Sequence, residues 1–198
     1  LSSHKYQSYV ELKKIPPPYE AYITGSDQVW NPSFTSKGEG SLTLSYFLDF
    51  GSSDVKRIAY AVSFGCLEYP EVLIRQVMPS IDRFDALSVR ENSGKNLLHN
   101  MGYQNVRVLP DPTLLLQRHE YDKFTDPKVS ATNSIATYLV NTRLDNPLKC
   151  AIGKVSKFVQ CTTKYICGYY AAKYGMENWI TAIKSSKYVI TDSYHGVI

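Results

Sequence analysis

Residues 57–64 read Arg-Ile-Ala-Tyr-Ala-Val-Ser-Phe, and Gly65 closes this stretch. The run is almost continuously apolar, which is typical of a strand buried on both faces of a parallel sheet. Shorter strand patterns lie on either side of it, at residues 22–24 and 86–89. The run at 57–64 therefore predicts a central strand with neighbours from both directions along the chain.

Helix patterns separate these predicted strands. A helix is expected over residues 73–84, with a kink or break at Pro79. A second helix is expected to begin at residue 92 or 93 and to end at Gly102, before a strand at 106–108. Strands that alternate with helices predict an α/β fold with parallel sheets.

A polar stretch at residues 117–133 is predicted to be a linker. Beyond it the chain again alternates strand and helix patterns, at 135–140, 147–157, 158–162, 179–183 and 188–191. We therefore expect an amino-terminal Rossmann-like lobe over residues 1–116 and the start of a carboxyl-terminal Rossmann-like lobe over residues 134–198.

Composition excludes several classes of protein. Of 198 residues, 43% are hydrophobic and 20% charged, so the chain can bury a core and is not disordered. No run approaches the ~18 apolar residues of a membrane span, which predicts no transmembrane segment. The chain starts at Leu1 and stops at Ile198, directly after a strand pattern. We expect it to be a fragment truncated at both ends.

The charges and cysteines argue against two further classes of site. The 22 basic and 18 acidic residues give a net charge of +4, and the basic residues are spread out, so no nucleic-acid partner is predicted. The four cysteines form no C-x-x-C pair and do not alternate with histidines, so no metal site is predicted. The cysteines are expected to be reduced, in a cytoplasmic protein.

Ligands of parallel α/β sheets bind beyond the carboxyl ends of the strands, so the polar residues that follow each strand are the informative ones. In residues 24–32, Gly25 lets the backbone approach a ligand, and Asp27 could act as a base or merely cap a helix. Arg90 precedes a predicted helix, so it could hold an anion or pair with a carboxylate such as Glu91.

Two more polar segments follow strands. Asp111 lies between two prolines and is expected to shape the junction between the lobes. His195 follows the strand at 188–191 and could be structural or functional. The nucleophile motif G-x-S-x-G and the phosphate-binding motifs G-x-G-x-x-G and G-x-x-x-x-G-K-[ST] are absent, which argues against a serine hydrolase, a dinucleotide site and a P-loop.

Taken together and in order, these segments resemble the polysaccharide pyruvyl transferase family. The matching motifs are GSDQVWNP at 25–32, YFLDF at 46–50, KRIAYAVSFG at 56–65, LSVRENSGKNLL at 87–98, VLPDPTLLL at 108–116 and YVITDSYHG at 188–196. Three departures stand out. The chain begins after the first strand and Gly-rich loop usual in the family, and it ends just after the His-Gly, where members continue with a helix and further elements. It also has Ser193-Tyr194-His195 where some relatives have Arg-Leu-His.

The resemblance implies a two-lobed, GT-B-like fold and a transferase. The reaction would move a pyruvyl group from phosphoenolpyruvate to a sugar diol, forming a ketal and releasing phosphate, with no cofactor or metal. The acceptor would be a glycan of a bacterial capsule, exopolysaccharide or cell wall, or a lipid-linked oligosaccharide. The work would be cytoplasmic and could take place at the inner face of the membrane, through peripheral contact.

The resemblance also assigns roles to residues. His195 and Asp27 are expected to be catalytic, His195 as proton donor or phosphate ligand and Asp27 on the acceptor hydroxyl. The residues expected to bind substrate are Arg90, Ser193, Gly25, Ser26, Gln28 and Gly196. Two alternatives remain: a GT-B glycosyltransferase that uses a nucleotide sugar, and a non-catalytic relative or fragment.

Overall fold

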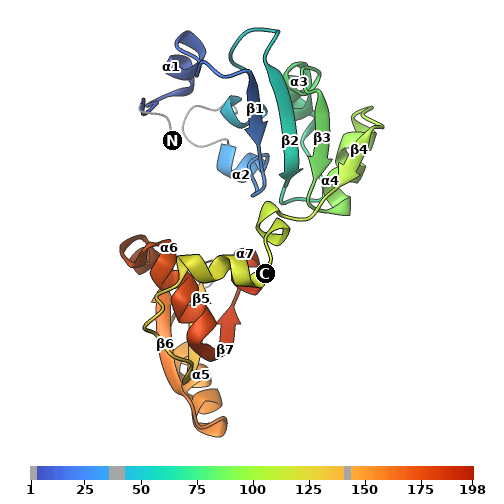
Figure 1. Cartoon of the computed structure of the whole chain (residues 1–198). Coiled ribbons are helices and arrows are strands. Elements are labelled where there is room, and N and C mark those ends of the chain that lie inside the picture. Colours follow the sequence, from blue (N-terminus) through green and yellow to red (C-terminus); the bar gives the residue numbers. More distant parts are fainter. Residues whose placement is uncertain (1–3, 36–42, 141–143) are drawn as a thin grey trace. The chain divides into compact units, whose positions relative to one another are not determined.

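The computed structural model describes residues 4–35, 43–140 and 144–198. Contacts within the chain divide it into two units, Leu1–Pro112 and Thr113–Ile198 (Figure 1). Each unit contains its own parallel sheet flanked by helices. The predicted α/β class with parallel sheets is therefore confirmed.

The first unit alternates strands with helical segments. In chain order these are α1 (Tyr9–Lys14), β1 (Ala21–Thr24), α2 (Pro32–Thr35), η1 (Ser45–Phe47), β2 (Lys56–Val62), α3 (Glu71–Ile81), β3 (Ala86–Val89), α4 (Asn92–Asn100) and β4 (Val106–Val108). The four strands lie in the order β1-β2-β3-β4, and all three pairings are parallel. The apolar run identified in the sequence is thus an inner strand, as expected.

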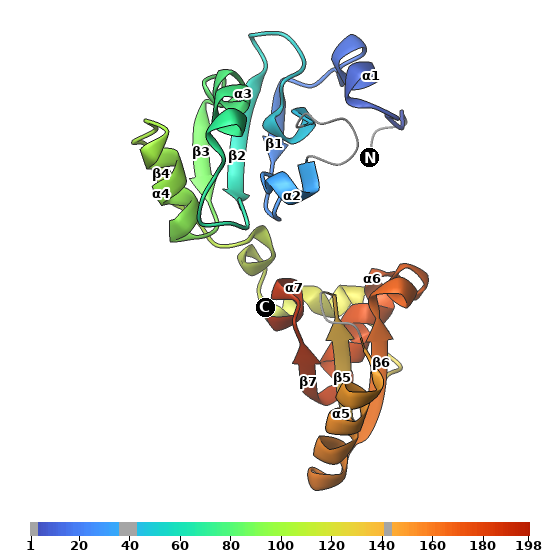
Figure 2. The same ribbon diagram turned by 180° about the vertical axis from the view of Figure 1, so that it is seen from behind.

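Helices α3 and α4 cover the same face of this sheet, because successive right-handed crossovers to the next strand return on one side (Figures 1 and 2). Val77 of α3 and Leu98 of α4 are fully buried there against Val62 and Val89 of the strands. The core thereby fixes where each strand ends, and it therefore also fixes where the loops after the strands begin.

Trp30 anchors the loop after β1. Its ring is fully buried, stacks on Phe47 at 4.9 Å between centroids and meets the edge of Phe64 at 5.3 Å. Its Nε1 donates to the carbonyl of Tyr46 (3.0 Å), so the polar end of the indole is also satisfied. The segment that precedes Trp30, residues 25–29, is consequently tied to the core.

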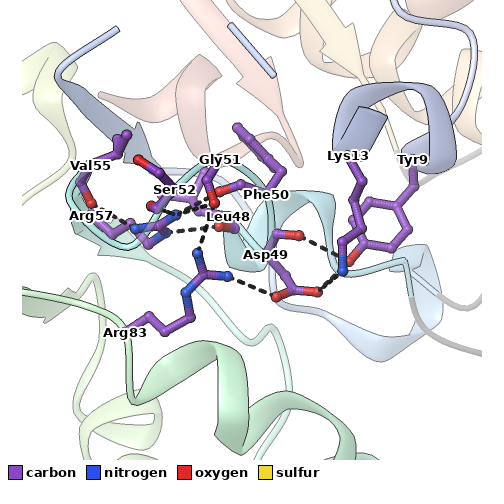
Figure 3. A network of polar contacts seen from close by, with 10 residues as sticks. All are labelled: Tyr9, Lys13, Leu48, Asp49, Phe50, Gly51, Ser52, Val55, Arg57 and Arg83. Atoms are coloured by element: carbon purple, nitrogen blue, oxygen red, sulfur yellow. Dashed lines mark hydrogen bonds and ion pairs between the residues drawn. The ribbon is translucent and has the colours of Figure 1, made fainter. Parts of the chain in front are cut away.

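A buried arginine organises the other end of β2 (Figure 3). Arg57 is 1% exposed, and every hydrogen bond that Figure 3 draws from its guanidinium goes to a main-chain carbonyl. The acceptors are the carbonyl oxygens of Leu48 (3.0 Å), Phe50 (2.6 Å), Ser52 (2.9 Å) and Val55 (2.6 Å), with Gly51 at 3.5 Å. This side chain therefore holds the loop that leads into β2.

Asp49 lies in the same loop and links three elements. Its carboxylate accepts from the Tyr9 hydroxyl (2.5 Å) and pairs with Lys13 (3.0 Å) and Arg83 (2.9 Å) (Figure 3). Burial opposes the charge, but the hydrogen bonds from Tyr9 and Lys13 and the charges of Lys13 and Arg83 outweigh it. The pKa of Asp49 is therefore lower than that of a free aspartate.

A pKa that is lowered by folding makes stability depend on pH. The stabilisation from Asp49 is complete above the unfolded-state pKa of about 3.9 and is lost as the pH falls through the lower folded-state pKa. We expect Asp49→Asn to lower the free energy of unfolding at pH 7 and to flatten its decline between about pH 5 and pH 2. Urea denaturation across this range measures both effects. The exposed Asp54→Asn should change neither, and an Asp49→Asn curve parallel to the wild type would contradict this account.

The second unit has a smaller sheet. Its elements are η2 (Pro112–Leu115), η3 (Arg118–Phe124), β5 (Thr132–Leu139), α5 (Asn146–Phe158), β6 (Thr162–Cys167), α6 (Gly168–Ser185), β7 (Ser186–Thr191) and α7 (Tyr194–Val197). The strand order is β6-β5-β7, with β5 parallel to both neighbours. Part of the segment predicted as a linker, residues 117–133, forms η3 within this unit.

The structure contradicts one local prediction and narrows another. The strand expected at 158–162 begins at Thr162, because helix α5 continues to Phe158 and its apolar residues belong to the helical pattern. Of the kink or break expected at Pro79, the break does not occur, since α3 runs unbroken to Ile81. Pro79 lies in the last turn, so few helical hydrogen bonds follow the one that its missing N–H removes.

Candidate functional site

The segments after the four strands of the first unit converge at one edge of the sheet. Main-chain hydrogen bonds connect them: Ser63 N–H donates to the Asp27 carbonyl (3.1 Å), and Arg90 N–H donates to the Val62 carbonyl (3.0 Å). Leu109 N–H donates to the carbonyl of Val89 (2.9 Å). The polar residues that follow β1, β2, β3 and β4 are therefore neighbours, as the rule for parallel sheets requires.

Arg90 is at the centre of this edge. Its side chain is 9% exposed and is surrounded by three carboxylates. Its Nη1 lies 3.6 Å from Asp111 Oδ2 and 3.9 Å from Asp27 Oδ1, and its Nε lies 3.6 Å from Glu91 Oε2. The ion pair with Glu91 that the sequence left as an alternative is present, together with two further ones.

Asp111 belongs to this cluster, which the sequence did not predict. Its side chain is fully buried, and Oδ2 accepts a hydrogen bond from the Ser26 hydroxyl as well as facing Arg90. Both contacts lie inside the first unit, so Asp111 does more than shape a junction between lobes. Its position directly after a strand, like that of Arg90, was the signal that could have placed it here.

The remaining partners differ in accessibility. Glu91 Oε1 accepts from the Ser63 hydroxyl (2.7 Å), which fixes the carboxylate beside Arg90. The Asp27 side chain is 70% exposed, and its Oδ1 accepts from the N–H of Gln28 (2.8 Å). Asp27 is therefore the acidic group of the cluster that a bulky ligand can reach most easily.

Local packing explains the residue type at two other positions predicted to bind substrate, Gly25 and Gln28. Gly25 adopts a φ of +141°, and a Cβ there would collide with the carbonyl oxygen of Tyr60 in β2, so only glycine fits. Gln28 Oε1 accepts from Asn31 Nδ2 (2.6 Å), and this pair covers Gly65. Both positions shape the edge at which Ser26, Asp27 and Arg90 meet.

The carboxyl end of β7 carries the second predicted cluster. Helix α7 begins directly after Ser193, whose hydroxyl accepts from the N–H of Gly196 (3.3 Å) and so caps the helix. A Cβ on Gly196 would lie 2.5 Å from Thr191 Oγ1, so the glycine admits the Thr191 side chain. His195 is half-buried and meets the Tyr194 ring edge-on at 5.5 Å.

The structure thus gathers Ser26, Asp27 and Arg90 in the first unit, and Ser193, His195 and Gly196 in the second. Across residues 4–35, 43–140 and 144–198, no group of three or more His, Cys, Asp or Glu residues is arranged to hold a metal ion. A hollow of about 600 Å³ lies along β2, β3 and β4, beside Tyr60 and Arg107. Its lining includes none of the predicted site residues.

Comparison with known proteins supports the resemblance seen in the motifs. The family model for "Polysaccharide pyruvyl transferase" matches residues 2–198. Searches of curated proteins and of solved structures found no significant match. Among the described helices, none has the length and apolar character needed to cross a bilayer.

Proposed function

Because the chain belongs to the polysaccharide pyruvyl transferase family, we propose that it transfers a pyruvyl group from phosphoenolpyruvate to two hydroxyls of a sugar. The observation that carries this proposal is the convergence of Asp27 and Arg90 at the carboxyl edge of a parallel sheet, where such folds bind ligands. The proposed acceptor is a glycan of a bacterial surface polysaccharide, and the proposed fold type is GT-B-like.

The proposed reaction forms two bonds from C2 of phosphoenolpyruvate to sugar oxygens and releases one phosphate. The first sugar hydroxyl adds to C2 of phosphoenolpyruvate while the methylene carbon C3 gains a proton and becomes a methyl group. The second hydroxyl then forms its bond to C2 as the bond from C2 to the phosphate oxygen breaks. The two hydroxyl protons balance the proton gained at C3 and the one that leaves with phosphate. This sequence needs one proton donor and one proton acceptor.

Arg90 is the proposed ligand of a donor anion, since a planar guanidinium matches a carboxylate or a phosphate. Three carboxylates within 3.9 Å already offset its charge, so it cannot neutralise the whole donor by itself. His195, at the start of a helix in the second unit, is proposed to act in the reaction as phosphate ligand or proton donor.

Asp27 is the proposed partner of the acceptor. Its exposed carboxylate can accept a hydrogen bond from a sugar hydroxyl and draw off its proton. The neighbouring Gln28 and Gly25 would shape the acceptor side of the site, and Ser26, which is hydrogen-bonded to Asp111 beside Arg90, would lie on the donor side. We also propose that the acceptor is carried on a lipid, as a lipid-linked oligosaccharide. The protein would reach it through peripheral contact at the inner face of the cytoplasmic membrane.

Ligand-induced stabilisation separates this function from its main alternative. A donor present at 100 times its dissociation constant adds about 2.7 kcal/mol to the free energy of unfolding. We expect phosphoenolpyruvate to raise the Tm of the protein and nucleotide sugars to leave it unchanged. Stabilisation by a nucleotide sugar alone would point to a glycosyltransferase, and stabilisation by neither would favour a non-catalytic relative.

Arg90→Lys tests the proposed donor ligand. Lysine keeps the charge but loses the planar fork, so the affinity for phosphoenolpyruvate should fall about tenfold or more, since a charge-assisted hydrogen bond contributes about 1.5–3 kcal/mol. Titration calorimetry measures the affinity, and a thermal melt checks that the variant is folded. The matched control is Arg75→Lys on the exposed surface of α3, which should bind normally. Unchanged binding by folded Arg90→Lys would reject the role.

A further inference from the structure

We propose that Asp111 is a positioning residue of the donor site, which fixes the Arg90 guanidinium and the Ser26 hydroxyl relative to each other. The inference rests on the function proposed above, because it needs Arg90 to bind the donor. It assigns a role in binding to a residue whose place in the sequence, between two prolines, favoured a role at the junction between the lobes over a chemical one.

The geometry joins the three side chains at one oxygen atom. Asp111 Oδ2 accepts the hydrogen bond of the Ser26 hydroxyl and also lies 3.6 Å from Arg90 Nη1. Ser26 follows β1, Arg90 follows β3 and Asp111 follows β4, so a single carboxylate connects three of the four strand ends. The prolines on both sides of Asp111 fix φ at residues 110 and 112, which restrains the backbone that carries the carboxylate.

Burial makes this carboxylate an effective restraint. Asp111 is fully buried and the Arg90 side chain is 9% exposed, so water screens their attraction far less than at an open surface. Glu91 holds the Nε side of the same guanidinium, and Ser63 in turn holds Glu91 (2.7 Å). Arg90 is thus restrained on two sides by groups that never need to touch the donor.

Restraint of this kind has a functional consequence. Arginine has many rotamers, and a ligand that must order a mobile side chain loses affinity. With Asp111 in place, the guanidinium is already oriented when the donor arrives. Without the charge of Asp111, Arg90 keeps its own positive charge and faces one carboxylate fewer, but it loses its fixed orientation. We expect the loss of orientation to outweigh the gain in net positive charge, so the affinity for the donor falls.

Asp111→Asn is the sharpest test, because asparagine has nearly the same shape and retains an oxygen that can accept from Ser26. We expect the KM for phosphoenolpyruvate to rise about tenfold, within the range of coupling between side chains in contact, because the ion pair that orients Arg90 is lost, with a smaller change in kcat. In an Arg90→Lys background the same change should have an effect of only about twofold, because side chains that act as a unit are not additive.

Two further variants separate positioning from plain stability. Ser26→Ala removes the other contact of Asp111 Oδ2, and it is expected to raise the KM for phosphoenolpyruvate even if Asp111→Asn fails to fold. Asp85→Asn is the matched control: Asp85 accepts from the main-chain N–H of Arg57 (2.8 Å), outside the cluster around Arg90. Its loss should lower the Tm and leave the KM unchanged.

Each result of these measurements either supports or overturns the positioning role of Asp111. Non-additive increases in KM with Arg90→Lys, absent from Asp85→Asn, support the positioning role. A wild type that binds phosphoenolpyruvate, with folded Asp111→Asn or Ser26→Ala binding it equally well, overturns the positioning role alone. Full additivity with Arg90→Lys overturns it too. A wild type that does not bind phosphoenolpyruvate removes the proposed function and this inference with it.

Discussion

Replacing His195 with alanine is expected to lower pyruvyl transfer at least ~100-fold, the low end of the range for general acid–base groups, while the protein stays folded. His195 follows β7 in a short helix capped by Ser193, and its ring is half-buried. The N–H groups at a helix start favour an anion, so a phosphate would be stabilised beside the His195 ring. A structural histidine would instead change stability and leave the turnover of each folded molecule intact.

The assay follows phosphate release from phosphoenolpyruvate with a glycan acceptor, beside a thermal melt of the same preparation. His119→Ala is the matched control, because His119 is an exposed histidine of η3 in the same unit. It should retain normal turnover and a normal Tm. Near-normal turnover of His195→Ala, or a loss that unfolding fully explains, would return His195 to a structural role.

Arg57→Met is expected to give the largest loss of stability, about 3 kcal/mol or more, since each buried polar group left without a partner costs about 1–3 kcal/mol. Methionine fills a similar space but leaves the carbonyl oxygens of Leu48, Phe50, Ser52 and Val55 without their donor (Figure 3). The loop into β2 would then lose its fixed conformation. Because β2 is an inner strand, the whole first sheet is expected to be affected.

Urea denaturation measures this loss, with Arg83→Met as the comparison. Arg83 is 32% exposed and contacts Asp49 and the Gly51 carbonyl, so its replacement should cost clearly less. An Arg57→Met protein as stable as the wild type, or less affected than Arg83→Met, would show that the carbonyl contacts contribute little.

The sequence predicted the fold well where one physical signal dominates. The unbroken apolar run at 57–64 and the alternation of strands and helices correctly indicated a parallel α/β protein. The strand after α5 was misplaced because Phe158 is apolar yet 87% exposed at the end of a helix, a position where composition misleads. Nothing in the sequence indicated that Arg57 would be buried, since its hydrogen-bond acceptors are main-chain carbonyls, which every residue type has.

The candidate site was predictable in part for the same reason. Ser26, Asp27 and Arg90 were placed together because each follows a parallel strand, and that rule depends on topology alone. Asp111 was given a different role because its flanking prolines suggested rigidity and nothing indicated a partner. The hydrogen bond from Ser26 joins residues 85 positions apart, a contact that no local pattern encodes.

The most direct test of the central claim is the mass of the glycan product. The protein, incubated with phosphoenolpyruvate and a glycan acceptor, should increase the mass of the acceptor by one pyruvate ketal and release one phosphate for each ketal formed. The same incubation with nucleotide sugars should leave the acceptor unchanged. An acceptor that gains a sugar residue from a nucleotide sugar, and no ketal from phosphoenolpyruvate, would contradict the account.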